Sequence, residues 1–264
     1  MRIDRSVFST LAALAFALTT VRSGVSQDWR TELKNRLGPR RTSLLRCIVR
    51  GKRLPRWGNL RADEPFSSEW GLDRGTPVDR HFTDRFFEEN RPFITGNVLE
   101  IQNRVYAARF GQGVRRLDTV DIDSQFQPTI VCDLSEAEAA IPSDQYDCFL
   151  LPYTLPFIAN LEGALRNAMR VVKPGGTVLA TASVIAPIFA EYPEYWRMTE
   201  HGWRETLARA WPGCDIDVRT YGNCVSGMAS VLGLAKEELK PRELEREDPR
   251  FPVLISIKGR KATG

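Results

Sequence analysis

Acidic residues stand at the ends of three consecutive apolar runs in the middle of the chain. Glu100 lies near the end of the first run, Asp121 ends the second, and Asp133 directly follows the third. Carboxylates gathered at one place repel one another unless a ligand offsets the repulsion. An adenosyl ligand does so, since it offers ribose hydroxyls, an exocyclic amine and a cationic sulfonium. The pattern therefore favours a nucleoside site; the alternative is that such acids, Asp123 and Asp133 among them, only cap helices.

Few other residues have the chemistry of a catalyst. Tyr153 follows the fourth apolar run and is the best candidate catalytic residue by position, with a purely packing role as its alternative. The chain has two histidines, His81 and His201, and either can serve as a base or simply be solvated or capping. The tripeptide 195–197 (Tyr-Trp-Arg) suits an anionic sugar or phosphate, or else docks the helix that follows it.

The sequence gives no sign of a metal site or of a nicotinamide cofactor. The five cysteines are odd in number and show no CxxC spacing, so neither zinc nor a disulfide framework is indicated. The loop after the first apolar run lacks the G-x-G-x-x-G pattern of dinucleotide-binding folds, and the GQG at 111–113 comes after the next helix, in the wrong place. We therefore expect no metal.

Alternating strands and helices must position these residues. Short apolar runs predict seven strands, at 97–101, 117–121, 128–132, 146–151, 177–181, 216–220 and 252–257. Helical periodicity and end signals predict helices at 77–90 (capped by Thr76), 104–110, 161–172, 199–211 and 226–239. Strand–helix alternation produces a mostly parallel sheet with helices on both faces, in which ligands bind at the carboxyl ends of the strands. The predicted fold class is thus α/β, with a Rossmann-like seven-stranded sheet.

Charge divides the chain into unlike parts. Residues 1–61 hold 14 Lys and Arg against 3 Asp and Glu, whereas the remainder carries a net charge of −7. We predict a basic, partly helical extension over 1–60, an irregular segment with a lead-in helix over 61–91, the main domain over 92–258 and a tail over 259–264. The extension suits phosphate, an acidic glycan, an anionic membrane surface or an acidic partner, or is a solvated arm.

The segment 7–21 is mostly apolar and follows two arginines, as the core of a secretion signal does. It is short for a membrane span, and Arg22 stands where small residues mark a cleavage site. We predict an N-terminal helix that contacts a membrane peripherally, in a cytoplasmic protein; a secretion signal or a mistaken start codon are the alternatives.

The ordered motifs resemble a known family. VLEI (98–101), CDL (132–134), YDCFLL (146–151) and VVKPGGTVLAT (171–181) are similar to the motifs of class I S-adenosylmethionine-dependent methyltransferases. A narrower set resembles a bacterial methyltransferase-domain family often found near glycosyltransferases of polysaccharide pathways. It comprises WGNLR (57–61), DRGTPVDR (73–80), YWRMT (195–199), YGN (221–223) and EDPRFPVLI (247–255). The resemblance covers about residues 54–258 and implies S-adenosylmethionine as the cofactor.

The resemblance also implies roles for single residues. Glu100 would order the first loop near the methionine moiety. Asp121 would accept hydrogen bonds from the ribose hydroxyls, and Asp133 would bind the adenine amine with the backbone of Leu134 beside it.

Two further positions complete the implied cofactor site. Pro152 and Tyr153 would line the path to the transferred methyl group. Gln102 also belongs to the site by position, but the family has glycine directly after VLEI, where this chain has Gln102. Glycine allows a close approach of the backbone and unusual dihedral angles, so this departure bears on cofactor binding.

Three functions are compatible with these features. We expect methyl transfer to a hydroxyl or amine of a small-molecule or glycan acceptor. A nucleic-acid methyltransferase that uses the basic arm is an alternative, although LPYT (151–154) stands where such enzymes have an N/D-P-P-Y-type motif. The third is a non-catalytic binding protein of the same fold, which Gln102 favours.

Overall fold

The structure, a computed structural model, describes residues 35–36, 58–61, 63–188 and 192–263. Two compact units divide the chain, Met1–Asp63 and Glu64–Gly264, and the second is described below. The predicted segment 7–21 and nearly all of the basic extension lie outside the described residues. Within the described part, no helix has the length and apolar character needed to cross a membrane.

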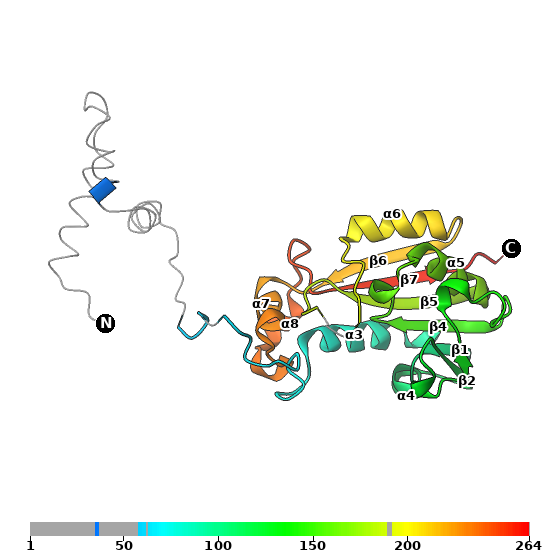
Figure 1. The fold of residues 1–264 in the computed structure, drawn as a ribbon, viewed down its shortest axis with the longest axis horizontal. Coiled ribbons are helices and arrows are strands. Elements are labelled where there is room, and N and C mark those ends of the chain that lie inside the picture. The colour runs from blue at the N-terminus through cyan, green and yellow to red at the C-terminus, as the bar shows by residue number, and fades with distance from the viewer. Residues whose placement is uncertain (1–34, 37–57, 62, 189–191, 264) are drawn as a thin grey trace, which may run out of the picture. The chain divides into compact units, whose positions relative to one another are not determined.

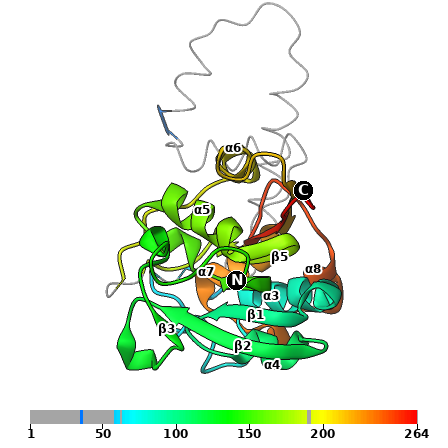
Figure 2. The same cartoon turned by 90° about the vertical axis from the view of Figure 1, so that its right-hand side faces the viewer.

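A seven-stranded sheet forms the centre of the second unit. Its strands follow the order β3-β2-β1-β4-β5-β7-β6, and all neighbours pair in parallel except β7, which is antiparallel to both β5 and β6. Figure 2 shows β3, β2 and β1 side by side at one end of the sheet. The strands are β1 (Gly96–Ile101), β2 (Val114–Asp121), β3 (Ile130–Val131), β4 (Tyr146–Pro152), β5 (Val172–Ser183), β6 (Asp215–Tyr221) and β7 (Leu254–Arg260).

Helices cover both faces of this sheet (Figure 1). One buried apolar cluster joins α5 and α6 to the sheet, and a second joins α3, α4 and α7 to it. The α-helices are α3 (Val78–Glu89), α4 (Val105–Phe110), α5 (Leu161–Val171), α6 (Glu200–Ala210), α7 (Cys224–Leu232) and α8 (Pro241–Glu245). Single 3-10 turns are η1 (Arg91–Phe93), η2 (Ser124–Phe126), η3 (Leu134–Glu136), η4 (Leu155–Phe157) and η5 (Lys236–Glu238). The predicted α/β class, with a Rossmann-like, mostly parallel sheet of seven strands, is confirmed, and the strand order is that of the class I methyltransferase fold.

Two details of the helices differ from the prediction. The helix predicted over 226–239 ends at Leu232, because Gly233 adopts a left-handed φ of 67° that closes the helix. Thr76 does not cap α3, since its hydroxyl donates to Glu237 and Pro77 occupies the position before the helix. The end of α7 is thus set by the backbone conformation of Gly233. Near the start of α3, Thr76 is engaged by Glu237, which is far away in the sequence.

A close contact between β7 and the C-terminal end of α6 positions α6 beside α5 on one face of the sheet. Trp211 is almost fully buried and its indole N–H donates to the carbonyl of Leu165 at 2.6 Å. The indole lies directly against the backbone of Gly259, where an added Cβ would stand 2.3 Å from a ring carbon of Trp211. Glycine is therefore required at this position, because any side chain would displace the indole.

We predict that Gly259→Ala lowers the free energy of unfolding by about 1–3 kcal/mol, the usual range for overpacking in a filled core. Denaturant unfolding followed by tryptophan fluorescence measures the change. Gly202→Ala in α6 is the matched control, because its added Cβ meets only the flexible side chain of Met198 at 3.3 Å. Equal stability of the two variants would contradict the packing assigned to Trp211.

Candidate active site

Glu100 joins the end of β1 to the start of α4. Its side chain is fully buried, and its two carboxylate oxygens accept the backbone N–H groups of Tyr106 at 2.8 Å and Ala107 at 2.9 Å. Both N–H groups belong to the first turn of α4, where a helix has no internal acceptors to offer them. Burial raises the pKa of Glu100 to about 7, against the opposing effect of the two N–H donors. Glu100 therefore holds the loop between β1 and α4 from beneath.

Gln102 follows in that loop with the backbone conformation of a glycine. Its φ is 61°, in the left-handed region, and its N–H donates to the carbonyl of Val120 at 2.9 Å. The side-chain oxygen accepts a hydrogen bond from the amide of Asn103 at 3.3 Å. Gln102 thus makes a left-handed turn of the kind that glycine makes most easily, at a strain of about 1–2 kcal/mol for a residue with a Cβ.

Asp121 ends β2, and Asp133 lies just after β3. Each accepts a local N–H as a capping residue does, and each also keeps an oxygen that a nucleoside could use. One oxygen of Asp121 accepts the N–H of Asp123 at 2.7 Å, and one oxygen of Asp133 accepts the N–H of Ser135 at 2.7 Å. The N–H of Cys132 donates to the carbonyl of Asp121 at 3.0 Å, which ties the two strand ends together. Within the described residues, the second carboxylate oxygen of each aspartate has no hydrogen bond, and so retains its capacity to accept one.

These residues fit an adenosyl ligand by the chemistry of their donor set. Unused carboxylate oxygens at the ends of β2 and β3 match hydroxyl and amine donors, and a left-handed turn follows β1. Leu134 follows Asp133 and is buried in the core, and Pro152 ends β4 half-buried. The sequence-predicted residues therefore lie at the carboxyl ends of four neighbouring strands.

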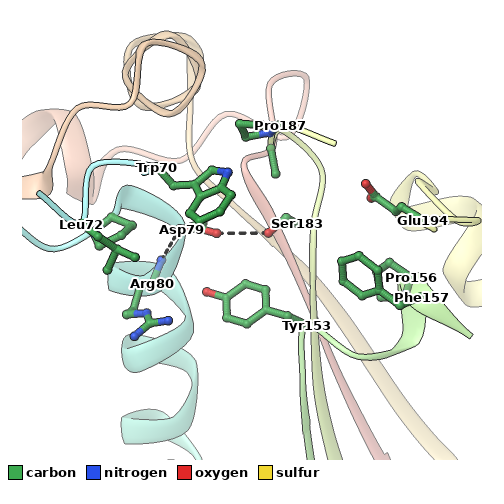
Figure 3. Close-up of a pocket in the computed structure, with 12 residues that line it drawn as sticks. Trp70, Leu72, Asp79, Arg80, Tyr153, Pro156, Phe157, Ser183, Pro187 and Glu194 are labelled. Carbon is green, nitrogen blue, oxygen red and sulfur yellow. Dashed lines mark hydrogen bonds between the residues drawn. The ribbon is translucent and has the colours of Figure 1, made fainter. Parts of the chain in front are cut away.

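A cavity of about 200 Å³ opens beside the end of β4 (Figure 3). Its walls are mostly apolar, and its polar groups are few. Apolar and aromatic residues that line it are Trp70, Leu72, Pro77, Tyr153, Pro156, Phe157, Ala186 and Pro187. The polar or charged residues are Asp79, Arg80, Ser183 and Glu194. Because Tyr153 directly follows Pro152, this cavity adjoins the end of β4, where the sequence predicts part of the cofactor site.

Tyr153 reaches into the cavity from a strained backbone. Its φ is 55°, while its N–H continues the sheet by donating to the carbonyl of Thr181 at 2.9 Å. Its phenol accepts a hydrogen bond of 2.5 Å from the hydroxyl of Thr83 in α3. Burial raises the pKa of Tyr153 well above its usual value, so the phenol stays protonated at neutral pH and is a hydrogen-bond donor rather than a base.

Asp79 was not predicted as a site residue. It lies in the first turn of α3 and is joined by a hydrogen bond to Ser183 at the cavity wall, as Figure 3 shows. One of its oxygens accepts the N–H of Arg80 at 2.8 Å, and the other accepts the hydroxyl of Ser183 at 3.2 Å. Burial raises its pKa, with the Arg80 N–H, the Ser183 hydroxyl and the Arg80 charge acting in the opposite direction. In the sequence, an acid at this position only indicates the start of a helix.

The other residues with catalytic chemistry lie outside the cavity. His81 is half-buried on α3, and burial lowers its pKa, whereas His201 is exposed on α6. Trp196 packs against the core and donates to the carbonyl of Ile158 at 2.8 Å, and Arg197 binds Glu194. In the structure, Trp196 and Arg197 thus anchor the chain segment that precedes α6. This agrees with the second interpretation of the tripeptide 195–197, in which it docks the following helix.

Comparison with known proteins agrees with this geometry. The stretch from 101 to 180, which contains Gln102, Asp121, Asp133 and Tyr153, matches a family model described as "Methyltransferase domain". The matched domain and the strand order of the sheet indicate S-adenosylmethionine as its cofactor. No curated protein matches the sequence.

Solved structures with a similar fold are distant in sequence. An S-adenosylmethionine-dependent methyltransferase from Mesorhizobium loti is 16% identical, with a TM-score of 0.47 over 72% of this chain and 100% of that one. One from Archaeoglobus fulgidus is 13% identical, with a TM-score of 0.47 over 69% of this chain and 94% of that one. At this distance the likeness concerns the fold only.

Replacing Glu100 should change how stability depends on pH. A carboxyl whose pKa rises from 4.5 in the unfolded chain to about 7 in the folded one stabilises the fold below pH 4.5, and that contribution is lost between 4.5 and 7. The free energy of unfolding of the wild type, minus that of Glu100→Gln, should therefore fall by roughly 3 kcal/mol over this range.

Urea unfolding at steps between pH 4 and 8 measures this difference. Glu136→Gln, which removes an exposed carboxylate near the end of β3, is the matched control. A difference between wild type and Glu100→Gln that stays constant with pH would show that the Glu100 carboxyl is not buried as described.

Proposed function

We propose that this chain transfers a methyl group from S-adenosylmethionine to a hydroxyl or amine of a small-molecule or glycan acceptor. The observation that carries the proposal is the position of the cavity. It is lined by Tyr153, the residue after β4, and β4 lies next to β1, whose end begins the predicted cofactor site. Methyl transfer needs these two sites to be adjacent, because the acceptor atom must reach the methyl carbon in line.

The cofactor would be held by the residues at the strand ends. Asp121 would accept the ribose hydroxyls and Asp133 the adenine amine, each through the carboxylate oxygen that is not engaged in a cap. Gln102 would present its left-handed backbone to the methionine end, with Glu100 fixing the loop. When bound, S-adenosylmethionine supplies a methyl group on a cationic sulfur.

The acceptor would be aligned by the cavity. Tyr153 and Pro152 lie between the two sites, and the aromatic walls restrict how a ring can enter. Holding two reactants in line supplies about 7–11 kcal/mol of the barrier in well-oriented cases. Most of the catalysis at such a site is therefore positioning.

The two alternatives are less well supported by the described residues. A polyanion is a poor match for an apolar cavity that also holds the carboxylates of Asp79 and Glu194, because nucleic-acid affinity depends on cationic contacts to phosphate. A non-catalytic role was favoured by Gln102, but its backbone keeps the glycine conformation. The basic extension lies outside the described residues, and its role stays a prediction.

Binding of the reaction product S-adenosylhomocysteine tests the cofactor site. We expect Asp121→Ala to weaken binding about 10- to 100-fold, since a hydrogen bond to a charged group contributes about 1.5–3 kcal/mol. Isothermal titration calorimetry measures the dissociation constant. Asp215→Ala, an exposed change in β6 at the opposite edge of the sheet, is the control and should bind as the wild type does. Failure of the wild type to bind would refute the proposal.

A further inference from the structure

The cavity holds four ionisable side chains, and their partners differ. The carboxylate of Glu194 is engaged by Arg197, whose guanidinium donates to its two oxygens at 2.7 and 2.6 Å. The phenol of Tyr153 is protonated, as described above. The guanidinium of Arg80 has only donor N–H groups and no atom that can accept a proton. Asp79 is therefore the one lining group, of those the structure describes, that is placed to take a proton.

The carboxylate of Asp79 is held in place but not saturated. Each oxygen has one hydrogen bond, from the Arg80 N–H and from the Ser183 hydroxyl, and a carboxylate oxygen accepts about two. One acceptor position on each oxygen stays available to a molecule in the cavity. Arg80 and Ser183 belong to α3 and to the end of β5, so two elements fix the direction of the carboxylate.

Backbone strain points to the same place. The described residues other than glycine with a positive φ are Trp70, Gln102, Gln127, Asp144 and Tyr153. Trp70 and Tyr153 both line the cavity, from opposite sides of Asp79 (Figure 3). Strain of this kind costs about 1–3 kcal/mol per residue, persists only where the surrounding structure imposes it, and is common at functional sites. The part of the cavity between these two aromatic residues, on either side of the carboxylate, is termed the slot; its aromatic walls suit an acceptor that carries a ring.

We propose that Asp79 is the general base of this site and that the acceptor is a neutral hydroxyl on a ring that the slot between Trp70 and Tyr153 admits. This inference rests on the proposed function and goes further by naming the base and the acceptor group. A hydroxyl is favoured over an ammonium ion, because Arg80 stands at the rim of the cavity beside Asp79.

The step balances without any further reactant. The O–H bond of the acceptor breaks, and its proton moves to a carboxylate oxygen of Asp79. The electron pair left on the acceptor oxygen forms the new bond to the methyl carbon, and the pair of the broken carbon–sulfur bond stays on sulfur. The negative charge of Asp79 and the positive charge of the sulfonium disappear together, which a mostly apolar cavity favours.

A pH-dependent rate follows from this role. Only ionised Asp79 accepts the proton, so the rate should rise with pH as this carboxyl ionises and then reach a plateau. The ionisable groups around Asp79 are Arg80 on the same helix, Tyr153 after β4, Tyr106 in α4 and Glu194 across the cavity.

The test compares Asp79→Asn with three other forms of the full chain: wild type, Tyr153→Phe and Asp84→Asn. Asparagine preserves the shape but does not accept the proton. Its oxygen can accept the Arg80 N–H, and its NH2 group can donate to the Ser183 oxygen in place of accepting from it. Asp84→Asn is the matched control, because Asp84 lies on the same helix, outside the cavity, and pairs with Arg109. Methyl transfer from radiolabelled S-adenosylmethionine is measured with two kinds of hydroxyl probe, methyl hexopyranosides and catechol, and with methyl glucosaminide as the amine probe. Saturation-transfer NMR in the presence of S-adenosylhomocysteine detects binding of the same probes without turnover.

We expect transfer to at least one hydroxyl probe and a 10²- to 10⁴-fold loss in Asp79→Asn, with S-adenosylhomocysteine affinity and probe binding unchanged. Tyr153→Phe should keep the rise of the rate with pH, and Asp84→Asn should match the wild type. Preferential methylation of catechol by the wild type would identify a phenol, and preferential methylation of the hexopyranosides a sugar hydroxyl.

Other outcomes overturn the inference while leaving the proposed function intact. If the wild type binds S-adenosylhomocysteine but neither binds nor methylates a hydroxyl probe, or prefers the amine probe, the acceptor class is wrong. Activity of Asp79→Asn within tenfold of the wild type would show that Asp79 is not the base. Only a wild type that does not bind S-adenosylhomocysteine would refute the function itself.

Discussion

The loop between β1 and α4 keeps its shape because the buried carboxylate of Glu100 accepts the first N–H groups of α4. This interaction satisfies donors that a short helix otherwise leaves unpaired, and it uses both oxygens of the acid. Glu100 thus acts on a ligand only through the loop, whereas Asp121 and Asp133 each keep an oxygen available. Acids that look equivalent in the sequence thus differ in the structure: Glu100 has both oxygens engaged, whereas the task we propose for Asp121 and Asp133 is to bind a nucleoside.

Strained backbone marks both halves of the proposed site. Gln102 takes a left-handed turn beside the strand ends, and Trp70 and Tyr153 do so around the acceptor cavity. Hydrogen bonds to neighbouring strands hold two of these residues in place. The N–H of Gln102 stays bonded to Val120 and that of Tyr153 to Thr181, so the ladder continues while each side chain is redirected. A rigid parallel sheet therefore supports conformations that an isolated loop would not keep.

The central strands β1, β4 and β5 were predictable because each contains an apolar run that the sheet buries on both faces. The apolar runs of the sequence also located the acids at their ends. The acceptor cavity was not predictable, because its polar pair, Asp79 and Ser183, is 104 residues apart and meets only when α3 packs beside β5. The left-handed turn at Gln102 was also hidden, since a residue with a Cβ gives no signal for it. The end of α7 at Gly233 was missed because the apolar pattern continues beyond it.

A crystal structure of the chain with S-adenosylhomocysteine tests the central claim most directly. We expect the ribose hydroxyls within hydrogen-bonding distance of the free oxygen of Asp121, the adenine amine near Asp133, and the sulfur facing the cavity at Tyr153. A nucleoside bound elsewhere, or a Gln102 side chain occupying the hollow between these strand ends, would contradict the assignment of the site.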